Sequence, residues 1–124
     1  WSDRMNASAQ LEQYWPILLL ALWFGHKFWR SRRVRSQLPQ LKAQGATLVD
    51  VRSAAEYASG HAPGTLNIPL DELGIRLSEI PRTTPVVLGC ASGTRSGMAG
   101  LLLRKHGYRQ VHNIGAWSQF LDRV

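Results

Sequence analysis

LGCASGTRSG, residues 88–97, contains the only cysteine of this 124-residue chain. The apolar residues 85–88 predict a buried strand and residues 98–104 predict a helix, so Cys90 opens a short strand-to-helix loop. Gly93 can adopt the positive φ that lets backbone N–H groups converge, and the start of a helix adds partial positive charge. We therefore predict an anion-binding loop around Cys90.

Arg95 adds a full positive charge and a planar fork of donors suited to oxyanions. Because such a loop favours anions, we expect the Cys90 thiolate to form at a lower pH than the thiolate of a free cysteine. A structural cysteine buried at a strand end is the simpler alternative. We favour sulfur chemistry on an anionic substrate, since a glycine, an arginine and a helix start coincide here. The backbone groups predicted to line the anion site belong to Ala91, Ser92, Gly93, Thr94 and Ser96.

Two other anion-binding loops differ from this one in spacing. A nucleotide-binding P-loop has four residues between its glycines and then Gly-Lys-Ser/Thr, whereas Gly89 and Gly93 enclose three residues. A cysteine phosphatase loop has five residues between its cysteine and its arginine, whereas Cys90 and Arg95 enclose four. A phosphatase or an arsenate reductase therefore stays open only as a weaker alternative.

The pattern Cys-x-x-Gly-x-Arg-Ser at 90–96 resembles the active loop of the rhodanese family, the thiosulfate and persulfide sulfurtransferases. Residues 48–52 (LVDVR) and 56–69 (EYASGHAPGTLNIP) resemble two earlier signatures of that family, and residues 107–111 and 115–117 resemble its closing pattern. The resemblance covers roughly residues 37–124. Ala116 and Thr65 depart from the residues usual in the family, and we expect only small backbone adjustments there.

The resemblance implies a double displacement in which Cys90 is the nucleophile and the persulfide carrier. The thiolate would attack the outer sulfur of thiosulfate, sulfite would leave, and the persulfide would pass its sulfur to a thiol or to cyanide. Arg95 and the loop backbone would hold the small anionic donor. No cofactor is implied. A noncatalytic module that senses sulfide or persulfide, or that binds a protein, is the alternative from a different class.

Three further polar residues are candidates for the pocket: Asp50, Arg52 and His61. An Asp at a strand end with an Arg two residues later is more typical of a structural ion pair, and a histidine in a Gly-His-x-Pro-Gly turn is more typical of a structural hydrogen bond. One cysteine without a Cys/His pair at ligand spacing predicts no metal site. A disulfide within the chain is excluded, which favours a reducing compartment.

Predicted strands alternate with predicted helices along the chain. The strands are 46–51, 66–68, 86–88 and a short one at Val111, and the helices are 36–44, 54–58, 71–80, 96–106 and 116–121. Ser53 and Glu56 predict a capping box for the second helix, and Gly45 a cap for the first. The predicted fold is α/β, a rhodanese-like three-layer sandwich with a central, mainly parallel sheet and a preceding N-terminal hydrophobic helix. Cys90 then lies at the carboxyl end of a strand, where ligands bind in such sheets.

Residues 11–29 are rich in leucine and aromatic residues and predict a transmembrane helix of about 28 Å, close to the roughly 30 Å hydrocarbon core. Residues 30–36 predict a basic juxtamembrane linker, which by the positive-inside rule places the domain in the cytoplasm. A signal peptide is disfavoured because the basic residues follow the apolar run. A helix packed on protein and a disordered tail stay open. Residues 1–10 are interpreted as an N-terminal tail. Our hypothesis is that residues 1–4 derive from a vector and that Met5 is the natural start.

The formal net charge of +7 does not indicate a nucleic-acid partner. Residues 1–36 carry six basic and two acidic side chains, while residues 37–124 carry nine and six. More than half of the excess therefore lies outside the predicted domain, so we expect no nucleic-acid binding.

Overall fold

The computed structural model describes residues 2–121, including the side chains of residues 12–121. Trp1, part of the segment interpreted as vector-derived, lies outside the described residues. The chain divides into two compact units, residues 1–30 and 31–124, and each is described by itself.

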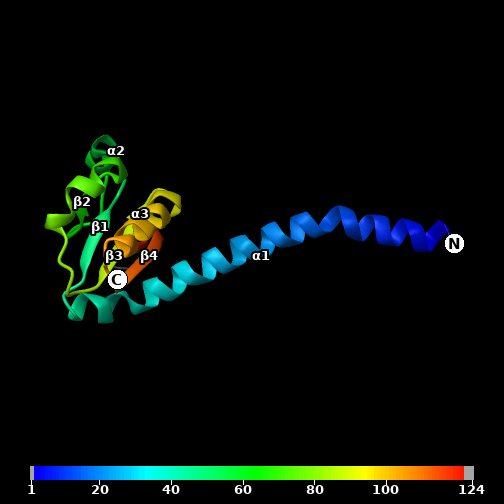
Figure 1. Ribbon diagram of the computed structural model, residues 1–124, viewed down its shortest axis with the longest axis horizontal. Coiled ribbons are helices and arrows are strands. Elements are labelled where there is room, and N and C mark those ends of the chain that lie inside the picture. The colour runs from blue at the N-terminus through cyan, green and yellow to red at the C-terminus, as the bar shows by residue number, and fades with distance from the viewer. Residues whose placement is uncertain (1, 122–124) are drawn as a thin grey trace. The chain divides into compact units, whose positions relative to one another are not determined.

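The first unit consists of the N-terminal part of helix α1, Ser2–Ala43 (Figure 1). Most side chains of residues 12–30 are exposed. In the described part of the chain, no helix combines the length and the apolarity that a membrane span requires. The apolar run Trp15–Gly25 would rise only about 17 Å, about half of a hydrocarbon core, before His26 and Lys27 follow. The predicted membrane span over 11–29, and the membrane-anchored localisation that depended on it, are therefore wrong.

Helix α1 also differs from the prediction of a separate lead-in helix at 36–44. It runs without a break through the basic residues 30–36, because arginine is a good helix former. Pro39 consequently lies inside the helix rather than in its first turn. The predicted cap is confirmed, since Gly45 has φ of 82° directly after the last turn.

The second unit contains a four-stranded sheet in the order β2-β1-β3-β4, and all its pairings are parallel. The predicted α/β fold with a parallel sheet is thereby confirmed. The strands are β1 Thr47–Asp50, β2 Leu66–Asn67, β3 Val86–Cys90 and β4 Val111–Ala116. The helices after α1 are α2 Ala54–Ser59 and α3 Thr94–Lys105, and the 3-10 helices are η1 Leu70–Ile75, η2 Leu77–Glu79 and η3 Trp117–Phe120.

The predicted helices at 71–80 and 116–121 are 3-10 segments instead. Gly74 weakens the first as an α-helix, and Arg76, between η1 and η2, adopts φ of −115°, outside the helical region. The predicted capping box of α2 is confirmed, because the Ser53 hydroxyl accepts from the Glu56 N–H and the Glu56 carboxylate accepts from the Ser53 N–H.

Each face of the sheet carries an apolar core, because side chains alternate along a strand. One core joins strand residues such as Val49 and Leu88 to Ala99 and Leu103 of α3. The opposite core joins Leu48, Val87 and Ile114 to the end of α1 and to η3. The α1 and η3 members of this second core are Leu38, Leu41 and Phe120. The sheet is thus covered on both faces. A ligand can therefore bind at the carboxyl ends of the strands, where Cys90 lies.

Candidate active site

Cys90 is the last residue of β3 and is completely buried. Gly93, the N-cap of α3, has φ of 95°, the left-handed conformation that the sequence predicted for it. This conformation turns the Gly93 N–H toward the cysteine, with 2.9 Å between the nitrogen and Sγ. The Ser96 hydroxyl lies 3.4 Å from the same sulfur. The loop therefore surrounds the sulfur with hydrogen-bond donors.

These donors make the thiol acidic. Burial has the largest single effect on the pKa of Cys90 and raises it, but hydrogen bonds from the Ser96 hydroxyl and from backbone N–H groups of Ser96, Ser92 and Gly93 together lower the pKa below its ordinary value. This direction agrees with the sequence prediction. The main cause differs in one respect, because hydrogen bonds from the loop, more than the charge of Arg95, lower the pKa of Cys90.

The other loop positions differ in their exposure to solvent. Ala91, Ser92 and Thr94 are exposed, and the Ser92 hydroxyl lies 3.5 Å from the Thr94 hydroxyl. Ser96 is buried in the first turn of α3. The side chains of the exposed residues thus lie at the surface, while backbone N–H groups of Ser92, Gly93 and Ser96 bond the sulfur.

Asn113 of β4 holds this loop in place, and sequence reasoning missed it. Its Nδ2 donates to the Gly93 carbonyl at 3.0 Å, and its Oδ1 accepts from the Ser96 hydroxyl at 2.7 Å. The same Oδ1 accepts from the Gly115 N–H at 2.9 Å. An asparagine two residues before a glycine is typical of such a local turn, and this was the signal available in the sequence.

A β-bulge places the β4 residues around Asn113. Leu88 pairs with Asn113 while Gly89 pairs with Gly115, so Ile114 is an extra residue on β4. Asn113 therefore contacts the loop above one face of the sheet, whereas Ile114 packs in the core of the opposite face. The φ of 88° at Gly115 permits this change of register.

Arg95 does not present an unpaired guanidinium to the site. Its Nη1 lies 2.6 Å from Glu56 Oε1 and its Nη2 lies 2.9 Å from Glu56 Oε2, a bidentate ion pair. Hydrogen bonds from Arg95 are the main cause that lowers the pKa of Glu56 to about 2, and the pair raises the pKa of Arg95. The sequence predicted Glu56 as a capping residue but not as the partner of an arginine 39 positions later.

Asp50 and Arg52 form a buried structural pair. The Arg52 guanidinium donates to both Asp50 carboxylate oxygens at 2.9–3.0 Å, and its Nη2 also donates to the Gly60 carbonyl at 2.7 Å. It also stacks on the Trp117 ring. His61 is exposed, stacks on Tyr57 and places Nδ1 2.8 Å from the Tyr57 carbonyl. All three contacts match the structural roles that the sequence favoured.

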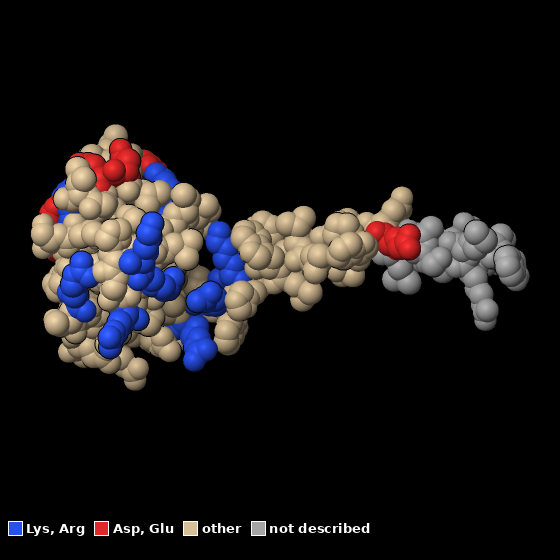
Figure 2. Space-filling view, viewed as in Figure 1, with Lys and Arg blue, Asp and Glu red and all other residues tan. Residues whose placement is uncertain are grey.

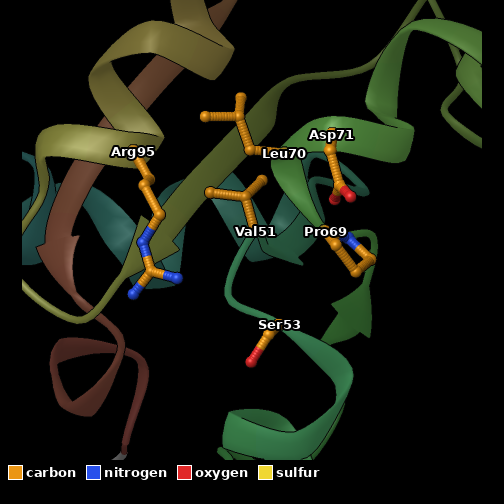
Figure 3. Close-up of a pocket in the computed structure, with 6 residues that line it drawn as sticks. All are labelled: Val51, Ser53, Pro69, Leu70, Asp71 and Arg95. Atoms are coloured by element: carbon orange, nitrogen blue, oxygen red, sulfur yellow. The ribbon is translucent and has the colours of Figure 1, made fainter.

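A pocket of about 350 Å³ lies beside the loop (Figure 3). Arg95 projects toward it from α3, and Asp71 and Leu70 belong to η1 on another side. Its surface is mostly apolar. The lining residues are Val51, Ser53, Pro69, Leu70, Asp71 and Arg95. Among the side chains described, no group of three or more His, Cys, Asp or Glu residues could hold a metal ion.

Comparison with known proteins finds the family model "Rhodanese-like domain" matching residues 34–122. A sulfurtransferase from Allochromatium vinosum is 45% identical over 67 residues, which are 54% of this chain. The chain spans about 55–63% of the length of two curated bacterial relatives.

Two solved structures share the fold. Human single-domain sulfurtransferase TSTD1 has a TM-score of 0.59 and 34% identity, covering 68% of this chain and 89% of that one. A rhodanese with anions from E. coli has a TM-score of 0.58 and 30% identity, covering 64% and 96%.

Proposed function

The chain belongs to the rhodanese-like domain family, and we propose that it is a sulfurtransferase that carries a sulfane sulfur as a Cys90 persulfide. The donor would be thiosulfate or a persulfide, and the acceptor a thiol or cyanide. Relatives named as sulfurtransferases support this role. The observation that carries the proposal is the lowered pKa of a cysteine surrounded by loop donors.

The reaction proceeds in two displacements. The Cys90 thiolate attacks the outer sulfur of the donor, the bond between the two donor sulfurs breaks, and sulfite or a thiolate leaves with the electron pair. An acceptor thiolate or cyanide then attacks the outer sulfur of the Cys90 persulfide, and the Cys90 thiolate leaves. The loop stabilises the thiolate in both half-reactions, because the Gly93 N–H and the Ser96 hydroxyl are directed at its sulfur.

This reaction does not require a separate general base. A nucleophile that is already ionised attacks without proton transfer, and both leaving groups are stable anions. The groups that contact Sγ in the described structure are hydrogen-bond donors, which fits stabilisation of a thiolate rather than removal of a proton.

Intact mass measurement tests the proposal. Incubation with thiosulfate or with an organic persulfide should add one sulfur to the protein, cyanide should remove it, and Cys90→Ser should show neither change. If neither donor adds a sulfur while the thiol titrates like a free cysteine, the proposal fails. The noncatalytic sensing or binding module would then replace it, and the complete burial of Cys90 is the observation that favours that alternative.

A further inference from the structure

Both guanidinium groups next to the candidate site are paired with carboxylates. Arg95 makes two hydrogen bonds to Glu56, and Arg52 makes three to Asp50. The carboxylate of Asp71 lines the pocket as well. These five side chains therefore carry two positive and three negative charges. Figure 2, viewed as in Figure 1, shows acidic side chains gathered at the end of residues 31–124 where α2 lies.

This balance of charge acts against a small dianionic donor. Thiosulfate carries two negative charges, and a planar fork on Arg95 would be its best partner. The Glu56 carboxylate already occupies two of the donors of that fork, at 2.6 and 2.9 Å. An incoming dianion would have to displace Glu56 or stay close to its charge, and both cost free energy.

The pocket favours a different kind of donor. Its apolar surface comes from Val51, Pro69 and Leu70, and its volume of about 350 Å³ lies at the lower end of the range of small-molecule sites. The apolar group R of a hydropersulfide, R–S–SH, would be removed from water in this pocket, which favours binding. Such a donor is neutral or singly charged, so Glu56 repels it less than it repels thiosulfate.

We propose that Glu56 is a specificity-determining residue that, by pairing with Arg95, makes the site select organic hydropersulfides over thiosulfate. The inference rests on the proposed sulfur transfer and narrows its donor class. In the loading step the Cys90 thiolate attacks the terminal sulfur of R–S–SH and the bond between the two sulfurs breaks. The products are the Cys90 hydropersulfide and the thiolate RS⁻, which leaves with the electron pair, so atoms and charge balance.

The test compares the rates at which two donors load Cys90, followed by intact mass under second-order conditions. Benzyl hydropersulfide has a neutral apolar body, and thiosulfate is the dianion. Wild-type protein should load faster from benzyl hydropersulfide. Glu56→Gln should raise the thiosulfate rate about 10-fold and leave the benzyl hydropersulfide rate within about twofold. Glutamine keeps the capping box with Ser53, so α2 should stay folded.

Glu72→Gln is the matched control. It removes the same charge from a half-buried position on η1, and its ion pair is with Arg76 rather than with Arg95. We expect Glu72→Gln to change neither loading rate more than about twofold. Glu56→Gln should therefore load from thiosulfate faster than Glu72→Gln does. Raising the salt concentration should speed thiosulfate loading of wild-type protein more than that of Glu56→Gln.

Leu70→Ala tests the pocket separately. This variant should slow loading from benzyl hydropersulfide about threefold more than it slows loading from thiosulfate, because it removes apolar surface and no charge. The inference is overturned if Glu56→Gln changes both donors by the same factor, if Glu72→Gln matches it, or if Leu70→Ala slows both donors equally. Absence of loading from both donors in wild-type protein would instead contradict the proposed function itself.

Discussion

Ser96 has one hydroxyl proton and two acceptors near it, Asn113 Oδ1 at 2.7 Å and Cys90 Sγ at 3.4 Å. Ionisation of the thiol makes the sulfur the stronger acceptor, so the hydroxyl donates most to the thiolate. Ser96→Ala should therefore raise the pKa of Cys90 and slow its alkylation at pH 7 about 10-fold. The pH dependence of iodoacetamide alkylation measures both effects.

An exposed serine provides the control for this prediction. Ser78 lies in η2, and Ser78→Ala should leave the alkylation profile unchanged. An unaltered profile for Ser96→Ala would mean that the backbone N–H groups of the loop alone set the acidity of Cys90.

The pair between Asp50 and Arg52 should matter more for stability than any exposed ion pair. Asp50 is 0% and Arg52 is 4% exposed, so Asp50→Ala leaves a buried guanidinium without its carboxylate. We expect a loss of about 3–5 kcal/mol in the free energy of unfolding, measured with urea. The exposed pair of Arg76 and Glu79 is the comparison, and Glu79→Ala should cost less than about 1 kcal/mol. Equal losses would contradict the structural role of the buried pair.

At the scale of elements, the contact between β3 and η3 is the tightest constraint on the site. A Cβ at Gly89, the residue before the cysteine, would lie 2.5 Å from Phe120 Cε2, an atom of a rigid, buried ring. Gly89→Ala should therefore displace η3 and lower the free energy of unfolding by about 1–3 kcal/mol. Urea unfolding measures the loss.

Gly74 in η1 is the matched glycine, because a Cβ there meets no atom within 4 Å. Gly74→Ala should leave the free energy of unfolding within about 0.5 kcal/mol of wild type. If Gly89→Ala is equally neutral, the Phe120 ring has room to move and the packing argument is wrong.

Local patterns in the sequence predicted the sheet, α2, α3 and the conformation of Gly93, because each depends on residues close together in the chain. The same patterns missed the partners of the loop. Glu56 meets Arg95 across 39 positions and Asn113 meets Gly93 across 20, and a single sequence carries no direct signal of such distant contacts. The prediction of a membrane span over residues 11–29 is wrong for another reason, since the leucine and tryptophan residues there form an apolar run that is too short to cross a bilayer.

At the scale of the whole molecule, the C-terminal end of helix α1 contributes to the core. Leu41 is 7% exposed and belongs to the core that contains Val87 and Ile114, whereas Leu20 is 55% exposed. Leu41→Ala should lower the free energy of unfolding by about 2–5 kcal/mol, and Leu20→Ala should change it by less than about 0.5 kcal/mol. Both substitutions make the same chemical change in one helix, so equal effects in urea unfolding would contradict this assignment.

The parallel order of the strands also bears on when the site appears during synthesis. Parallel strands pair only after a crossover, and β4 is the last strand of the sheet in chain order. A chain that has left the ribosome only as far as α3 already contains Cys90 and Arg95, but Asn113 and Phe120, which hold the loop and cover Gly89, are not yet in place. On the growing chain Asn113 cannot yet hold the loop, so we expect the loop donors to lower the pKa of Cys90 fully only when β4 joins the sheet.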